Sequence, residues 1–194
     1  MDIFIISIRA ERLRVSLQHL DHLSQAVTIV PACNGQLIDK NRWHGSLRRG
    51  QLGCFESHCR VWRYIVENDV QFAIVLEDDA VLTPSRMQRL QKVTENLPQH
   101  WDLLLLGRHY ARKENRQRVA PGLVQTGAFW GTHAYLIPCS TAIKLLRHPK
   151  VQTMTEPIDE VLSQLGLSDE LLILACQPEI CLLKETASDT VSID

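Results

Sequence analysis

Short apolar runs alternate along the chain with stretches of helical periodicity. Residues 3–8, 72–76 and 101–107 are almost entirely apolar and do not alternate between apolar and polar positions. Runs of this kind are typical of strands that are covered on both faces of a sheet. Between them, apolar residues recur at three- and four-residue spacing, the pattern of amphipathic helices. The whole pattern predicts an α/β domain with a mostly parallel sheet flanked by helices.

The expected elements follow one another without an internal repeat or a linker. Strands are expected at 3–8, 26–32, 72–76, 101–107, 133–137, 171–176 and 179–183. Helices are expected after the first strand, where Leu13, Leu17 and Leu20 share one face, and at 51–68, 84–97, 140–148 and 157–166. The polar segments 36–50 and 108–122 are expected to be loops, and the polar tail to be partly disordered. We therefore expect one domain spanning residues 1–194.

Composition and charge narrow the class of protein. The formal net charge of −1 gives no general attraction to nucleic acid or to an anionic membrane. The apolar runs are too short to span a bilayer, and the first arginines follow the N-terminal apolar run, the reverse of a secretory signal. We expect a cytoplasmic protein, with peripheral contact at the inner face of a membrane left open. The six cysteines lack CxxC spacing and are expected to be reduced.

One segment, residues 108–118, is more basic than the rest of the chain. Its basic residues are Arg108, His109, Arg112, Lys113, Arg116 and Arg118, and Tyr110 is its one aromatic residue. Without interleaved aromatic residues or a basic domain around it, the segment does not indicate nucleic-acid binding. A solvated loop is the simplest interpretation, and a loop that docks an anionic glycan or a nucleotide phosphate is the functional alternative.

Three adjacent carboxylates stand at the end of the apolar run 72–76. Glu77, Asp78 and Asp79 precede a return to apolar residues at Ala80, so they are held near the core. In an open α/β sheet, ligands bind beyond the carboxyl ends of the strands. Side chains alternate along an extended chain, so Glu77 and Asp79 are expected on one side and Asp78 on the other. Two carboxylates on the same side suit a hard divalent cation with open positions for phosphate oxygens. The alternative is a solvated junction with exposed carboxylates, and the residues alone leave both open.

Residues 50–82, GQLGCFESHCRVWRYIVENDVQFAIVLEDDAVL, resemble the signature block of glycosyltransferase family 25, the lipooligosaccharide and collagen galactosyltransferase family. That block is a G-E-L-G-C-x-x-S-H-x-x-x-W helix followed by an apolar strand and L-E-D-D. The stretches IISIRAERLR, VPACNG, GTHAYLIPCSTAIKLL, EPIDEVL and ASDT are similar to other family motifs, in the same order. Ser7, Asn34 and Ala134 depart from the family pattern.

The resemblance implies a GT-A-like nucleotide-sugar-binding sheet and a metal-dependent, inverting hexosyltransferase. The donor implied is UDP-galactose, with UDP-glucose as the alternative, and the cofactor is Mn²⁺ or Mg²⁺ held by a DXD-like motif. Carried over, that motif is the acidic cluster, with Asp79 as the first metal ligand. Glu77 or Asp78 acts as a second ligand, through the ribose or through a water. Asp189 could reach the metal or the diphosphate, and a disordered tail is its alternative.

The resemblance also implies the residues around the nucleotide sugar. They are Ile8, Arg9, Arg12, Ala32, Asn34, Gly35, Ser57 and His58, together with Glu77 and Asp78. Each has a structural alternative: a surface helix for the arginines, a plain turn for 32–35, and a structural histidine for His58.

Asp159 is the implied general base for the acceptor hydroxyl. Its alternative is a carboxylate favoured by the N-terminus of a helix. The acceptor implied is a surface glycan such as a lipooligosaccharide or a glycoprotein, and the process implied is lipopolysaccharide biosynthesis. Two other functions stay open: a hydrolase of nucleotide sugars, and a binding or adhesion module that has lost catalysis.

Overall fold

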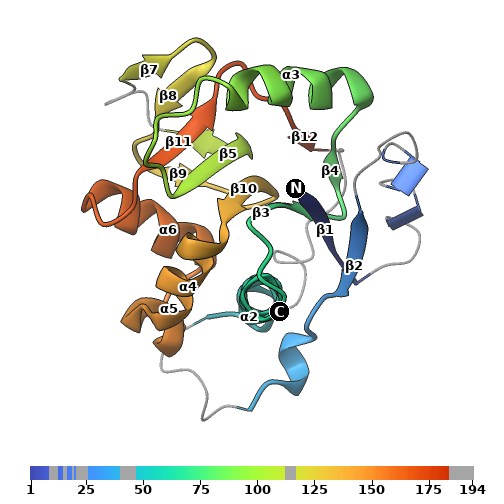
Figure 1. Cartoon of the computed structure of the whole chain (residues 1–194). Coiled ribbons are helices and arrows are strands. Elements are labelled where there is room, and N and C mark those ends of the chain that lie inside the picture. Colours follow the sequence, from blue (N-terminus) through green and yellow to red (C-terminus); the bar gives the residue numbers. More distant parts are fainter. Residues whose placement is uncertain are drawn as a thin grey trace.

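The computed structural model describes residues 1–8, 13–14, 17–18, 20, 26–39, 47–111 and 117–183. These residues form a central twisted sheet with helices on both faces (Figure 1). Within the described residues, no helix is both long enough and apolar enough to cross a bilayer.

The sheet has eight strands in the order β2-β1-β3-β10-β5-β11-β8-β7. Their bounds are Val27–Pro31, Asp2–Ser7, Phe72–Glu77, Ala134–Pro138, Leu103–Gly107, Ile173–Cys176, Leu123–Gln125 and Arg118–Ala120, in that order. Strands β10 and β8 pair antiparallel with both of their neighbours, whereas β1 is parallel to β2 and β3, and β5 to β11. The other six strands therefore share one direction, and the predicted α/β sheet, mostly parallel and flanked by helices, is confirmed.

Two short ribbons and six helical segments complete the described fold. Strand β4 (Ala80–Val81) pairs with β12 (Leu182–Leu183), and β6 (Tyr110–Ala111) pairs with β9 (Phe129–Trp130). The helices are η1 (Gly35–Leu37), α2 (Arg49–Glu67), α3 (Pro84–Thr94), α4 (Cys139–Arg147), α5 (Pro149–Thr153) and α6 (Ile158–Leu167).

Each face of the sheet has its own hydrophobic core, which explains why the strand sequences show no alternation. In β1, Phe4 and Ile6 pack with α2 and the α4–α6 side, whereas Ile3 and Ile5 pack with α3. Successive side chains of a strand point to opposite faces, so a strand covered on both faces needs apolar residues at every position. The helical residues Leu13, Leu17 and Leu20 also pack against the α3 side, as their spacing predicted.

The predicted strands and helices are found with boundaries shifted by a few residues, and the loops are where the prediction was wrong. The segment 108–122 contains two short strands, β6 and β7, and the segment 36–50 contains η1 and the first turn of α2. Strands β8 and β9 were missed as well. These strands are only two or three residues long, too short to show a period, although β7 and β8 pair with each other locally.

Candidate functional site

The carboxyl ends of β1, β2 and β3 meet at one edge of the sheet. In the parallel register, Ile6 pairs with Glu77 and Ser7 pairs with Pro31. The residues that follow each strand therefore lie close together, although up to 70 positions separate them in the sequence. This is the edge at which open α/β sheets bind ligands.

The acidic cluster forms a turn at this edge. Strand β3 ends at Glu77, and Asp78 and Asp79 form the turn into β4. The Ser7 hydroxyl donates a hydrogen bond of 2.8 Å to Asp78 Oδ2, which ties the turn to the end of β1. The prediction that Asp78 points away from Glu77 and Asp79 was wrong, because β3 ends at Glu77 and the two aspartates lie in the turn that follows it. All three carboxylates line one cavity.

That cavity has a volume of about 170 Å³ and gathers most of the residues predicted from the sequence. The predicted residues among its lining are Ile8, Ala32, Asn34, Gly35, Ser57, His58, Glu77, Asp78 and Asp79. Others in the lining are Ile6, Cys33, Gln36, Arg49, Gly50, Gly53 and Cys54. The walls thus come from the end of β1, the turn before η1, the first turns of α2 and the acidic turn.

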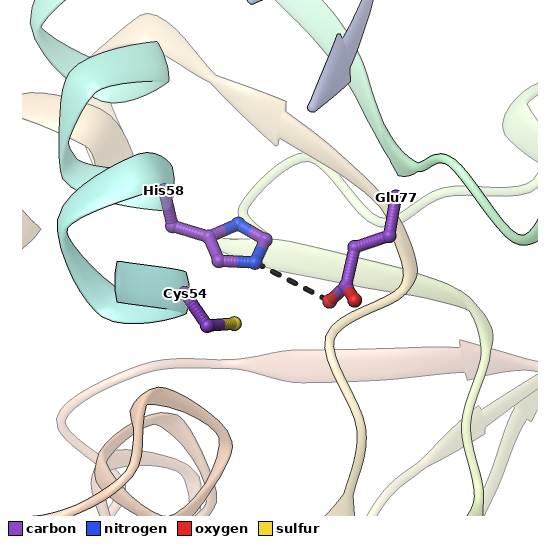
Figure 2. A group of neighbouring side chains, drawn as sticks. All are labelled: Cys54, His58 and Glu77. Atoms are coloured by element: carbon purple, nitrogen blue, oxygen red, sulfur yellow. Dashed lines mark ion pairs between the residues drawn. The ribbon is translucent and has the colours of Figure 1, made fainter. Parts of the chain in front are cut away.

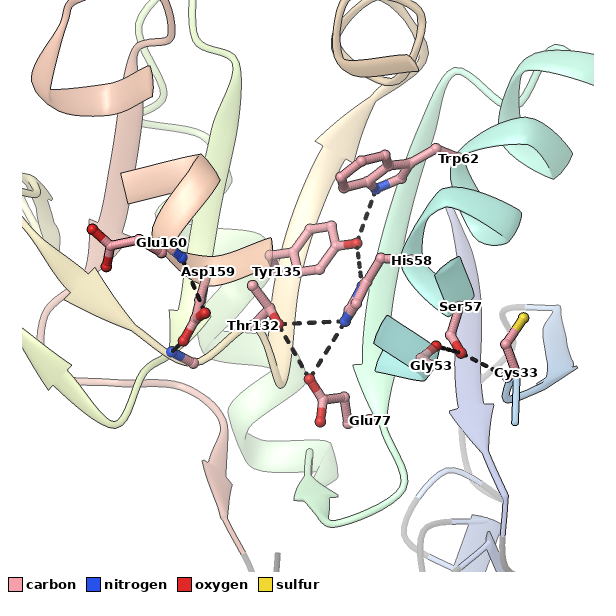
Figure 3. A network of polar contacts seen from close by, with 11 residues as sticks. Cys33, Gly53, Ser57, His58, Trp62, Glu77, Thr132, Tyr135, Asp159 and Glu160 are labelled. Carbon is pink, nitrogen blue, oxygen red and sulfur yellow. Dashed lines mark hydrogen bonds and ion pairs between the residues drawn. The ribbon is translucent and has the colours of Figure 1, made fainter. Parts of the chain in front are cut away.

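Helix α2 and the turn at 32–35 hold one another in place. The Cys33 N–H donates to Ser57 Oγ at 2.8 Å, and the Ser57 hydroxyl donates to the Gly53 carbonyl at 2.6 Å (Figure 3). Ser57 is fully buried, so its hydroxyl serves this contact. The sequence suggested that Gly35 allows close approach to a nucleotide. In the structure, the space that a Cβ of Gly35 would take is filled by the Arg49 carbonyl, 1.8 Å away, so the glycine is required for packing against α2.

His58 stands at the centre of a buried polar network (Figure 3). Its Nδ1 lies 2.9 Å from the Tyr135 hydroxyl, which also accepts the Trp62 indole N–H at 3.0 Å. Its Nε2 lies 3.4 Å from Glu77 Oε1 and 3.3 Å from the Thr132 hydroxyl. The sequence placed His58 away from the apolar face of its helix. It is in fact 1% exposed, because η1, the sheet and α6 cover α2 on several sides.

The cavity concentrates negative charge. Burial raises the pKa of the Cys54 thiol well above its ordinary value, and the nearby carboxylates of Glu77, Asp159 and Asp79 raise it further. Burial also acts to raise the pKa of Glu77, but the hydrogen bond and charge of His58, together with the charge of His133 and the hydrogen bond of Thr132, lower that pKa below its ordinary value. A Glu77 carboxylate kept ionised beside two aspartates is a donor set that suits a hard divalent cation, so the residues present fit the implied metal.

Asp159 lies in the first turn of α6, outside the lining of the cavity but near enough to raise the pKa of the Cys54 thiol. One carboxylate oxygen accepts the Gly131 N–H at 2.9 Å, and the other accepts the Glu160 N–H at 3.0 Å (Figure 3). Gly131 has a positive φ of 90°, which favours glycine. Each oxygen keeps a free lone pair. The carboxylate is thus held in one orientation and can still accept a proton.

The predicted site and loop residues do not all belong to the part of the chain that the structure describes. Arg9, Arg12 and Asp189 are outside the described residues. Of the predicted basic loop, residues 112–116 are outside the described part too. Arg108 is buried, 3.6 Å from Glu179 Oε1 and 3.2 Å from Thr126 Oγ1, so it does not belong to a solvated loop. Arg108 directly follows β5, and because its charge is buried it requires a partner of opposite charge, which Glu179 supplies.

Four residues at the site were missed as functional candidates: Ser7, Cys54, Thr132 and Tyr135. Cys54 carried a signal, because it stands four residues before His58 and so shares a helix face with it. Tyr135 was read as part of a core strand, and its partner His58 is 77 positions away. A local sequence pattern cannot reveal a contact between residues so far apart in the chain.

Comparison with known proteins agrees with this geometry. The model of glycosyltransferase family 25 (LPS biosynthesis protein) matches residues 1–162. Procollagen galactosyltransferase 1 from Danio rerio is 29% identical over 185 residues, and the match covers 83% of this chain and 30% of that protein. The inactive glycosyltransferase 25 family member 3 from Mus musculus is 28% identical over 184 residues, covering 83% of this chain and 31% of that protein.

A solved structure shares the fold at low identity. Mouse xyloside xylosyltransferase 1 superposes with a TM-score of 0.50 at 12% identity, covering 89% of this chain and 83% of that chain. The chain spans about a third of the length of the curated relatives it matches. The family model covers most of the described residues, including the cavity and Asp159. The chain therefore belongs to glycosyltransferase family 25.

Proposed function

We propose that this chain is a metal-dependent inverting glycosyltransferase that transfers a hexose from a nucleotide sugar to a saccharide hydroxyl. The donor proposed is UDP-galactose, with UDP-glucose as the alternative. The observation that carries the proposal is the single cavity shared by the 32–35 turn, the start of α2 and the acidic turn 77–79. Two relatives that bear galactosyltransferase or family 25 names support the reaction class.

The binding roles divide between the two sides of the cavity. The turn Ala32–Gly35 offers backbone groups and a small side chain to the nucleoside, and Asn34 caps η1 by accepting the Gln36 N–H at 2.9 Å. On the other side, Asp79 and Glu77 would hold Mn²⁺ or Mg²⁺, with Asp78 fixed by Ser7 toward the ribose or a metal-bound water. The ion would supply charge stabilisation for the departing diphosphate.

Asp159 is proposed as the general base. In an inverting transfer, the acceptor oxygen forms a bond to the anomeric carbon as the bond between that carbon and the diphosphate oxygen breaks. The nucleoside diphosphate leaves with the bonding electrons, and the proton of the acceptor hydroxyl goes to the base. The two N–H donors orient the Asp159 carboxylate for this task. The acceptor proposed is a saccharide of a glycoconjugate, such as a lipooligosaccharide or a glycoprotein.

A panel of nucleotide sugars tests the proposal. Each would be tested by thermal unfolding and by release of free nucleotide, with Mn²⁺ and with a chelator. A donor should raise the melting temperature only with metal, since a ligand that binds the folded state stabilises it by mass action. Release of nucleotide that requires an acceptor sugar indicates transfer, whereas release without an acceptor indicates hydrolysis. Absence of any response to every nucleotide sugar would overturn the proposal.

A second candidate is a binding module without turnover. It is favoured by the relatives whose names call them inactive, at 28% identity. Such a module would show the metal-dependent stabilisation by a nucleotide sugar, or by a glycan alone, but no nucleotide release with any acceptor. The same panel therefore separates the two functions.

A further inference from the structure

Three side chains of different chemistry converge on the wall of the cavity. Cys54 Sγ, a ring nitrogen of His58 and a carboxylate oxygen of Glu77 all lie within 4.8 Å of one another (Figure 2). Cys54 and His58 are one helical turn apart on α2, so both project from the same face. Glu77 comes from the end of β3 and points back toward the helix (Figure 2).

We propose that Cys54, His58 and Glu77 form a binding site for a thiophilic cation of the Zn²⁺ type. Thiolate, imidazole and carboxylate are the three ligand classes that Zn²⁺ takes in proteins. The hard cation of the proposed reaction prefers oxygen ligands and has little use for Cys54. The inference goes beyond the proposed function, because it concerns a second class of metal and does not require glycosyl transfer.

The spacing of the ligand atoms fits a tetrahedral ion with small adjustments. With bond lengths of about 2.0–2.3 Å, two ligands of a tetrahedral zinc ion lie roughly 3.3–3.8 Å apart. The distance from His58 Nε2 to Glu77 Oε1 is already 3.4 Å. The remaining pairs lie within 4.8 Å, so they need to close by roughly 1.5 Å at most, which rotation of the Cys54 and Glu77 side chains can supply.

The surroundings hold the imidazole as a ligand requires. Metal-bound histidines usually use their second ring nitrogen in a hydrogen bond that fixes the ring. Here Nδ1 meets the Tyr135 hydroxyl at 2.9 Å, and Tyr135 is itself held by the Trp62 indole at 3.0 Å. A phenol oxygen can accept a hydrogen bond from Nδ1 as well as donate one, so the Nε2 lone pair can face the ion.

The ligands also leave access to the ion. Cys54, His58 and Glu77 all line the cavity, so three protein ligands would leave the fourth position facing its interior. This is the arrangement of open zinc sites, in which a water or a ligand takes the last position. An ion bound here occupies Glu77, and so it competes with the hard cation proposed for the acidic turn.

Cobalt binding provides a test that does not depend on activity. Co²⁺ is added alone to the reduced protein, and its absorption spectrum reports thiolate ligation as a sulfur-to-cobalt band in the near ultraviolet and tetrahedral geometry as strong visible bands. We expect both in the wild type, with displacement by one equivalent of Zn²⁺. Cys54→Ser should lose the thiolate band, and Glu77→Gln should weaken cobalt binding about 10-fold or more.

Two other cysteines provide the controls. Cys33→Ser removes the other thiol of the cavity, and Cys139→Ser removes a thiol at the opposite edge of the sheet, where its N–H bonds the Gln71 carbonyl. Both should keep the wild-type spectrum, and circular dichroism checks that each variant is folded. A wild type without a thiolate band would overturn the proposal, as would a band that survives in Cys54→Ser or disappears in Cys33→Ser. If Cys54→Ser does not fold, loss of visible bands in folded Glu77→Gln decides the question.

Discussion

Replacing Gly53 with alanine tests how the turn at 32–35 is held against α2. A Cβ at Gly53 would lie 2.5 Å from the Cys33 carbonyl oxygen and 2.9 Å from the Gly35 nitrogen. Both neighbours are backbone atoms of the turn that lines the cavity. To restore ordinary contact, the turn and the helix must separate by roughly 0.5–0.9 Å, which a close-packed interior resists.

The expected change in stability is the sum of two opposing effects. Overpacking a close contact costs about 1–3 kcal/mol. Alanine gains about 0.5–1 kcal/mol over glycine inside a helix. The free energy of unfolding should therefore fall by roughly 0.5–2 kcal/mol, which lowers the melting temperature by roughly 1–8 °C in a chain of this size. Affinity for the nucleotide sugar should fall as well, because the displaced turn is the wall proposed to hold the nucleoside.

Gly166 supplies the matched control. It also lies in a helix, and its added Cβ would meet only the side chain of Ile173, at 3.1 Å from the terminal methyl group. That methyl can move, so Gly166→Ala should melt between the wild-type temperature and roughly 3 °C above it. Calorimetry gives the melting temperatures, and titration of a UDP-sugar gives the affinities. The reasoning is refuted if Gly53→Ala melts as high as Gly166→Ala and binds the nucleotide as the wild type does.

The other predictions concern the acidic turn and the buried network. Asp79→Asn should keep the fold but reduce turnover at least 100-fold; unchanged turnover would mean that the metal lies elsewhere. Tyr135→Phe leaves the Trp62 indole N–H and His58 Nδ1 without their partner, and should cost about 2–4 kcal/mol in denaturant unfolding; a loss under 0.5 kcal/mol would contradict the network. Burial lowers the pKa of His133 to about 4, so the native state binds fewer protons than the unfolded state between about pH 6.5 and 4. The free energy of unfolding is therefore unaffected by His133 above that window and falls by up to about 3 kcal/mol as the pH drops through it. In His133→Asn the free energy of unfolding should depend less on pH, and the same dependence in both proteins would refute the assignment of the pKa to His133.

The sequence predicted the core of the fold because each central element carries its own local signal. Strands β1, β3 and β5 are apolar at nearly every position, and helix α2 repeats its apolar residues at helical spacing. The short strands β8 and β9 carry no such signal, because two or three residues are too few to show a period, and the pairing of β8 with β11 joins segments distant in the sequence.

Most residues of the candidate site were predicted from the sequence, but the contacts between them were not. The family motif indicated the acidic turn, His58 and Asn34, and the structure brings them to one cavity. The motif could not show that Ser57 supports the 32–35 turn, since that depends on the approach of two backbones across Gly53. Nor could it show the partners of His58, because Tyr135 lies in β10 and Thr132 in the segment just before that strand, both more than 70 positions from His58 in the sequence.

The central claim is that the acidic turn binds a nucleotide sugar through a divalent cation. Calorimetric titration of UDP-galactose tests it most directly, with Mn²⁺, with a chelator, and with Mn²⁺ in Asp79→Asn. The account predicts binding of one UDP-galactose per chain with Mn²⁺, and at least 10-fold weaker binding in the other two conditions. Equal affinity in all three would contradict it.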